Sequence, residues 1–148
     1  MVHRIRTDSA YGDDLQRLAE DTASEDPHGD QGATIRGLYR DWDRDRKLPT
    51  DLVEKTAAAT VRGQQNWDAA RRANDFAMLS DTLNNIVDLK REAGQRISEG
   101  TNRTPYEALL DEYEPDARVT ELQEVFDNFR IPLVDLISQI KDAPTQPE

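Results

Sequence analysis

Acidic side chains form the first clusters in this sequence that could do chemistry. Glu107, Asp111 and Glu114 lie three or four residues apart, which places them on about one face of a helix, and Glu121 and Glu124 follow. Paired carboxylates can exchange protons with a substrate or bind a metal ion. A two-metal site in a helical bundle also requires Glu-x-x-His pairs, and none of these glutamates is followed by a histidine at that spacing. We therefore interpret these acids as helix caps and surface charge.

A second acidic group, Asp41-x-Asp43-x-Asp45, is similar to the start of a calcium-binding loop. Such a loop requires glycine at its sixth position and, at its twelfth, a glutamate that binds with both oxygens. The sequence has Arg46 and Leu52 at these two positions. We expect a solvent-exposed helix face here rather than a metal site.

Histidine and cysteine, the usual ligands of zinc, are scarce. The only histidines are His3 and His28, and there is no cysteine, which excludes disulfides, thiolate catalysis and Cys-based zinc sites. Catalytic zinc needs three protein ligands and an open position for water, and a HExxH motif supplies two of those ligands together with a glutamate base. Neither histidine belongs to such a motif. We predict that this chain has no catalytic residue, no metal ligand and no cofactor, and is not itself an enzyme.

The net charge of −11 argues against polyanionic partners. Binding to nucleic acid requires lysines and arginines that displace counterions from phosphates, and anionic membrane surfaces repel an acidic chain in the same way. Charged residues make up 33% of the sequence and the mean hydropathy is −0.86, so no stretch is apolar enough to span a bilayer. The first residues, MVHRIRTDSAYGDD, also lack the apolar run of a secretory signal. We expect a cytoplasmic protein without nucleic-acid or membrane partners.

Apolar residues recur at helical spacing along most of the chain, whereas strand-like alternation is rare. We predict an all-α fold of about five helices in an antiparallel, bundle-like arrangement. One domain is expected over residues 1–148, with a first helix and polar loop in 1–34, a helical core in 35–140 and a flexible tail in 141–148. The longest loop is predicted at 21–32, which is polar and contains proline and glycine.

Proline, glycine and capping residues predict where the helices of the core begin and end. Pro49 should separate the second helix from a third that runs from about Thr50 to Asn74. Ser80 and Asp81 are expected to cap the fourth helix, which Gly100 ends. The predicted inner face of the third helix consists of Val53, Ala57, Thr60, Gln64 and Trp67, and Trp67 and Trp42 are expected to be core anchors.

The last two helices have the clearest local signals. Thr104-Pro105-Tyr106-Glu107 has the pattern of a capping box with proline in the first turn. The final helix then keeps one apolar face over roughly five turns. That face is formed by Leu122, Val125, Phe126, Phe129, Leu133, Leu136, Ile137 and Ile140.

Three spaced segments together resemble a known family. The first is Leu48-Pro49 with Leu52-Val53; the second is WDAARRANDF, with Trp67, Arg71, Asp75 and Phe76; the third is PYEALLDEYEP, with Pro105, Tyr106, Leu109, Leu110, Tyr113, Glu114 and Pro115. In order and spacing they resemble the thermostable carboxypeptidase Taq family of helical zinc metallocarboxypeptidases. The resemblance is best from about Ile35 to Ile140 and implies the helical part that precedes the HExxH motif of that family. Asp116 stands where the family usually has glycine.

The resemblance implies a function in docking rather than in peptide hydrolysis. Members of this family are several-fold longer, so faces of this segment should be covered in them by the rest of the fold. We predict a non-catalytic, carboxypeptidase-related helical domain that acts by self-association or by packing on a partner protein. The alternative is one half of a split zinc carboxypeptidase, which would need a separately encoded HExxH subunit. The predicted contacts of a homodimer are Val125, Phe129, Leu133, Leu136 and Ile140.

Overall fold

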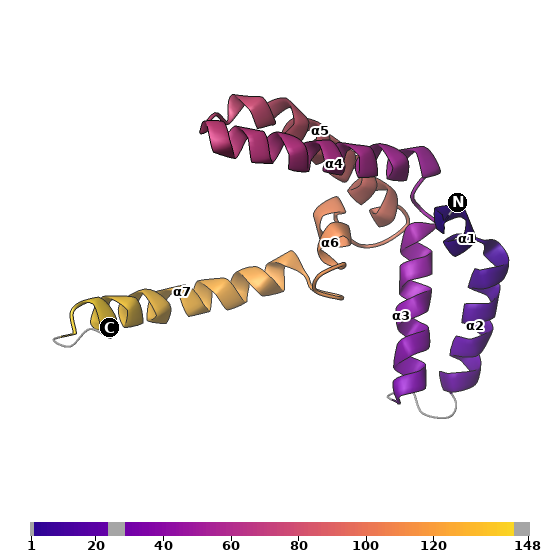
Figure 1. Cartoon of the computed structure of the whole chain (residues 1–148). Helices are drawn as coiled ribbons and strands as arrows, with labels where there is room; N and C mark the ends of the chain where they lie inside the picture. The colour runs from indigo at the N-terminus through magenta and orange to yellow at the C-terminus, as the bar shows by residue number, and fades with distance from the viewer. Residues whose placement is uncertain (1, 24–28, 144–148) are drawn as a thin grey trace.

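The computed structural model describes residues 2–23 and 29–143, and these residues form seven helices and no strand (Figure 1). The all-α class is therefore confirmed, although the helices outnumber the five or so expected. One reason is that Asp8 separates two helices near the N-terminus, where its carboxylate accepts a hydrogen bond from the Ala10 N–H at 2.9 Å. The helices are α1 (Val2–Arg6), α2 (Ser9–Ala23), α3 (Asp30–Asp45), α4 (Thr50–Ala73), α5 (Ala77–Ser98), α6 (Pro105–Leu110) and α7 (Val119–Lys141).

The first antiparallel pair consists of α2 and α3 (Figure 1). Leu15 and Ile35 are buried between them, and Trp42 lies so close to Gly12 that a Cβ there would come within 2.0 Å of the indole ring. The indole N–H of Trp42 also donates to the carbonyl of Asp8 at 3.1 Å. Trp42 thus anchors α3 on α2, as its expected role requires. The predicted loop at 21–32 is shorter than expected, because α2 and α3 extend into it, and residues 24–28 lie outside the described part.

The second antiparallel pair consists of α4 and α5. The predicted bounds of α4 are confirmed, and Asn74 ends it in the left-handed conformation, with φ +52°. The predicted start of α5 is wrong: α5 begins at Ala77 because Asp75, not Ser80, accepts a hydrogen bond from the Ala77 N–H at 3.0 Å.

The predicted inner face of α4 is also wrong. Its buried residues are Leu52, Ala59, Gly63 and Ala70, and Trp67, expected in the core, is 43% exposed. The small residues face α5, where a Cβ on Gly63 would come within 2.7 Å of an Ile86 methyl group. Two helices can approach closely only where such side chains are small, and this requirement determines which side of α4 is buried.

The short helix α6 packs against the end of α5. Ala108 is the most buried apolar residue of the described part, at 1% exposure, and a Cβ on Gly94 would come within 2.7 Å of the Pro105 carbonyl oxygen. The predicted capping box at Thr104 is confirmed, with both of its hydrogen bonds present. A turn then leads from α6 to α7.

The last helix, α7, extends away from both helix pairs as a separate arm (Figure 1). Across Val119–Lys141, no residue is buried. The bundle-like arrangement expected from the sequence therefore holds within the two antiparallel pairs but does not include this arm. None of the helices in 2–23 and 29–143 is both long and apolar enough to cross a membrane.

Candidate docking surface and the polar cluster at its base

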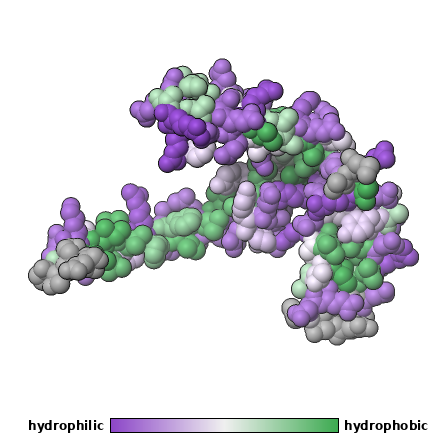
Figure 2. All heavy atoms as spheres, in the orientation of Figure 1, coloured by the Kyte–Doolittle hydropathy of each residue, from purple (hydrophilic) through white to green (hydrophobic). Residues whose placement is uncertain are grey.

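The most unusual surface of the described molecule is the apolar side of α7, which Figure 2 shows as a hydrophobic strip along the arm. The five predicted contact residues share this side, and four of them are 51–61% exposed, with Leu133 half-buried. Phe126 and Ile137 lie on the same side and are 62% and 55% exposed. We define the α7 apolar face as Val125, Phe126, Phe129, Leu133, Leu136, Ile137 and Ile140.

An exposed apolar face of this kind is expected to be covered by another surface. Monomeric proteins seldom expose contiguous apolar patches of more than a few hundred Å² unless the patch is an interaction site. A helix also gains most of its stability from packing of its apolar side, rather than from intrinsic propensity. The chemistry available on α7 is therefore hydrophobic association with another surface.

Two apolar residues of α7 that the sequence analysis did not single out lie off this face. Ile131 is 77% exposed and Val134 is 56% exposed, and both border a shallow depression whose rim includes Asp127 and Arg130. At about 100° per residue, Ile131 lies nearly opposite the centre of the α7 apolar face. Both lie outside the apolar stripe of the helix, so an argument based on apolar periodicity did not include them.

Glu107 connects the start of α6 with the start of α7. Its side chain is buried, and one carboxylate oxygen accepts hydrogen bonds from the N–H and the hydroxyl of Thr104 at 2.9 and 3.0 Å. The other oxygen accepts from the Val119 N–H at 3.2 Å, which satisfies an amide in the first turn of α7. These backbone hydrogen bonds, from Thr104 first and Val119 second, hold the pKa of Glu107 below its ordinary value. The sequence predicted the contact with Thr104 but not the contact with α7.

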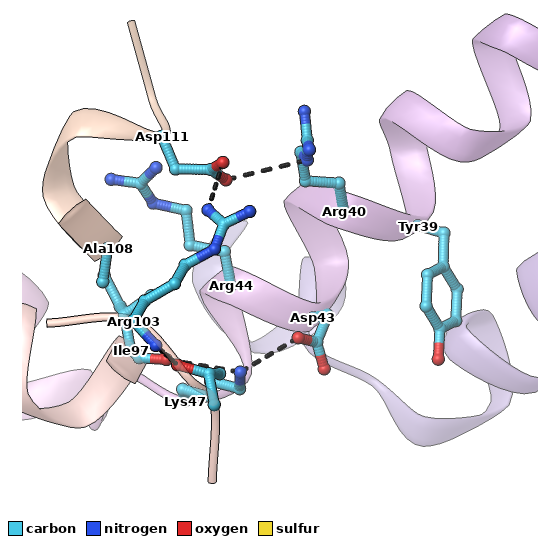
Figure 3. Close-up of a pocket in the computed structure, with 10 residues that line it drawn as sticks. Tyr39, Arg40, Asp43, Arg44, Lys47, Ile97, Arg103, Ala108 and Asp111 are labelled. Carbon is cyan, nitrogen blue, oxygen red and sulfur yellow. Dashed lines mark hydrogen bonds and ion pairs between the residues drawn. The ribbon is translucent and has the colours of Figure 1, made fainter. Parts of the chain in front are cut away.

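An ion-pair network lies beside Glu107, and we refer to Arg40, Arg103, Asp111 and Asp116 as the Asp116 cluster. The Asp116 carboxylate accepts from Arg40 at 2.7 Å and from Arg103 at 2.6 Å. Arg103 also pairs with Asp111, and Arg40 lies 3.7 Å from the same carboxylate. Figure 3 shows both guanidinium groups directed at Asp111. The sequence analysis interpreted Asp111 as a helix cap or surface charge, noted Asp116 only as a replacement for glycine, and missed the cluster.

The backbone at Asp116 is left-handed, with φ +66°. Aspartate is one of the few residues other than glycine that tolerates this conformation. Its N–H donates to Asp111 at 2.8 Å, so backbone and side chain both belong to the cluster. The turn thus keeps the geometry that a glycine would adopt readily, and the aspartate adds a carboxylate to it.

The charges of the cluster lower the pKa of both aspartates. The hydrogen bond from Arg40 is the main reason that the pKa of Asp116 lies below its ordinary value. Partial burial raises the pKa of Asp111, but the Asp116 N–H and the Arg103 guanidinium together outweigh burial, so this pKa is also lowered. Both carboxylates are therefore ionised across the neutral range.

A cavity of about 280 Å³ lies below the cluster, between α3 and α6 (Figure 3). Its basic side chains all have acidic partners: Arg44 pairs with Glu112 at 2.8 Å, and Lys47 pairs with Asp43 at 3.1 Å. Arg40 and Arg103 belong to the cluster described above. Each basic side chain of the cavity is thus paired with a carboxylate of the chain itself.

Comparison with known proteins identifies this architecture. Residues 1–148, the whole chain, match the model of the carboxypeptidase Taq (M32) metallopeptidase family. The chain belongs to this family. The resemblance noted in the sequence is thus confirmed and extends to the residues before Ile35.

Family members are much longer than this chain. Thermostable carboxypeptidase 1 of Thermus thermophilus is 25% identical over 155 residues, an alignment that covers 100% of this chain and 30% of that protein. The enzyme of the same name from Pyrococcus furiosus is 27% identical and is covered to 23%. The solved structure of Trypanosoma cruzi metallocarboxypeptidase 1 superimposes on 99% of this chain with a TM-score of 0.80, at 27% identity, and is covered to 30%. The chain therefore spans less than a third of these relatives.

The M32 motif residues at the end of α4 and in the turn before α5 have a structural explanation. Arg71 lies over the Trp67 ring at 5.4 Å, and Asp75 caps α5 directly after the left-handed Asn74. The WDAARRANDF segment thus builds the tight turn that reverses the chain between two helices, and Phe76 remains 65% exposed there.

The other M32 motif residues lie at helix starts or on the surface. Pro49 is the residue before α4, and Pro105 is the first residue of α6. Leu109 and Leu110 are half-buried. Tyr106, Tyr113, Glu114 and Pro115 of the PYEALLDEYEP segment are exposed.

The acidic groups weighed as metal sites have other partners. Asp43 pairs with Arg46 and Lys47, and Asp45 pairs with Arg6. His3 contacts the Leu48 carbonyl through Nε2 at 2.9 Å, and His28 lies outside the described residues. In the part of the chain that the structure describes, no group of three or more His, Cys, Asp or Glu side chains is placed to hold a metal ion.

Proposed function

We propose that this chain is a non-catalytic, carboxypeptidase-related docking domain that acts through the α7 apolar face, by self-association or by packing on a partner protein. One observation carries the proposal: a 23-residue helix presents seven large apolar residues, and none of its residues is buried. Removing such a face from water stabilises an interface by roughly 25 cal/mol per Å² of apolar area. A homodimer, a protein partner, a cytoplasmic location and the absence of nucleic-acid and membrane partners remain predictions.

The test is to break the α7 apolar face without unfolding the chain. Leu136→Glu places a charge on the face at a residue that is 52% exposed, so we expect little loss of stability but at least tenfold weaker self-association. Ile131→Glu is the matched control, because it adds the same charge to the same helix on the opposite side.

Sedimentation equilibrium at tens of micromolar measures this association directly. We expect a dimer for the wild-type protein and for Ile131→Glu, and a monomer for Leu136→Glu. A wild-type monomer would exclude self-association and leave only a different partner protein. Equal weakening by both variants would show that the α7 apolar face is not the contact.

A second candidate function is one half of a split zinc carboxypeptidase. It is favoured by the superposition on 99% of this chain, which leaves 70% of the solved metallocarboxypeptidase for a complementary polypeptide. We expect the purified chain with zinc to release no C-terminal residues from a peptide. Mixing it with a family segment that carries HExxH but lacks these helices should restore release, and Leu136→Glu should prevent the restoration. Zinc-dependent release by the chain alone would contradict its non-catalytic role.

A further inference from the structure

Polar contacts connect the base of α7 to the rest of the chain. No residue of α7 is buried, so packing along its length does not orient it. Three contacts hold the start of the helix. Glu107 accepts from the Val119 N–H, Arg118 donates to Asn102 at 2.8 Å, and Asp116 accepts from two arginines.

Of these three contacts, the one at Asp116 reaches the first helix pair. Two further ion pairs join α3 to the turn after α6, Arg40 with Asp111 at 3.7 Å and Arg44 with Glu112 at 2.8 Å, but neither involves a residue next to α7. Arg40 belongs to α3, whereas Arg103 lies just before α6 and Asp116 lies just before α7. A single carboxylate therefore joins three parts of the chain, with Arg40 and Asp116 separated by 76 positions in the sequence. Glu107 and Arg118, in contrast, connect α7 only to neighbouring residues around α6.

The exposure of the cluster makes this connection sensitive to its surroundings. The Asp116 side chain is 73% exposed, and those of Arg40 and Arg103 are 37% and 20% exposed. A single exposed ion pair contributes little, but several charges in one network with short contacts contribute more. In about 0.5 M salt the Debye length falls to roughly 4 Å, which screens exposed pairs strongly.

We propose that the Asp116 cluster is an electrostatic latch that holds α7 in its docking direction, and that loss of the Asp116 charge or high salt releases the helix. This inference rests on the proposed docking function, because it concerns how the α7 apolar face is presented. With the latch closed, the face has one direction. With the latch open, the helix samples many directions, and docking must then overcome the cost of ordering it.

The absence of cysteine allows a direct measurement of the latch. Ala33→Cys on α3 and Asn128→Cys on α7 are both at exposed positions and can carry a pair of spin labels without competing thiols. The distance distribution between the labels is recorded by pulsed electron–electron double resonance spectroscopy, with both labels placed in the Leu136→Glu variant. We expect that variant to be monomeric, which sedimentation equilibrium checks, so the distances report on the single chain.

Asp116→Asn is the informative variant, because asparagine also tolerates the left-handed backbone but carries no charge. Asp51→Asn is the matched control, since it removes the same charge from an exposed pair with Lys55 on α4, at 2.8 Å. We expect a narrow distribution for the unmodified latch and for Asp51→Asn in low salt. Asp116→Asn in low salt, and the unmodified latch in 0.5 M salt, should give a broad one. A narrow distribution for Asp116→Asn would overturn the latch.

Self-association is then measured without the Leu136→Glu substitution, which tests whether release of the latch weakens docking. Asp116→Asn should weaken the dimer several-fold, whereas Asp51→Asn should not. Broadening of the distance distribution without weaker association would overturn the link to docking. If the wild-type protein forms no dimer, the proposed self-association fails while the latch is still decided by the distance distribution.

Discussion

The α4–α5–α6 region and α7 use apolar residues in opposite ways. In the described part of the chain, half of the buried apolar residues are alanines, and Gly63 and Gly94 allow α4, α5 and α6 to approach closely. The helix α7 instead carries large aliphatic or aromatic residues in every turn, and none of its residues is buried. Small side chains thus form a large part of the internal core, while much of the large apolar surface faces outward.

This contrast separates two physical roles of apolar residues. Small side chains in α4 and α5 gain stability from close backbone approach and from dispersion contacts. Large side chains on α7 gain little within the chain, because their apolar area stays in contact with water. The apolar area of α7 can therefore contribute hydrophobic free energy only when another surface covers it.

The largest expected effect on stability comes from replacing one leucine of each region by alanine. Leu52 is 3% exposed, so Leu52→Ala should lower the free energy of unfolding by about 3 kcal/mol through lost burial and a cavity. Leu136 is 52% exposed, so Leu136→Ala should change it by less than about 0.5 kcal/mol. Urea unfolding at concentrations where the protein is monomeric measures both values. Similar losses for the two variants would show that α7 packs within its own chain in solution.

Smaller effects on stability, of opposite sign, are expected when two glycines are replaced by alanine. Gly94→Ala places a methyl group within 2.7 Å of the Pro105 carbonyl oxygen, which should cost about 1–3 kcal/mol through overpacking of α6 on α5. Gly37→Ala meets nothing within 4 Å on α3, so the higher helix propensity of alanine should stabilise the chain by about 0.5–1 kcal/mol. Thermal unfolding of the two variants checks both signs. Stabilisation by Gly94→Ala would contradict the close contact between α5 and α6.

Local signals in the sequence explain which parts of the fold could be predicted. The bounds of α4 followed from Pro49 and Asn74, and the capping box at Thr104 followed from residues three positions apart. The buried side of α4 was missed because alanine and glycine give weak periodicity, so the larger Trp67 was wrongly assigned to the core. Size complementarity with α5, not hydrophobicity, determines that side.

The candidate site was predictable only in part, for a different reason. Periodicity identified the apolar face of α7, since a stripe is a property of one helix. It could not show that nothing in the described chain covers this face, because covering depends on where other helices lie. The Asp116 cluster was not predictable, since Arg40 and Asp116 are 76 positions apart and surface charges carry no pattern that pairs them.

The smallest expected effect concerns pH and the polar base of α7. The pKa values of Asp111 and Asp116 lie below 3.8, the ordinary aspartate value, and that of Glu107 lies below 4.5, the ordinary glutamate value. A carboxyl group with a lowered folded-state pKa contributes stability that is fully present above its unfolded pKa and is lost as pH falls through the folded value. Stability should therefore be constant from neutral pH to about pH 5 and fall below about pH 4.

Asp116→Asn tests whether the cluster contributes to this pH dependence. Asparagine does not titrate, so the urea midpoint of the variant should fall less steeply between pH 5 and 3 than that of the wild-type protein. An equally steep fall would show that Asp116 does not contribute to the pH dependence. If only the base of α7 depends on these charges, the distance distribution between spin labels on α3 and α7 should broaden at low pH before α4 and α5 unfold. Simultaneous loss of all helices would show instead that the polar base and the small-residue core form one cooperative unit.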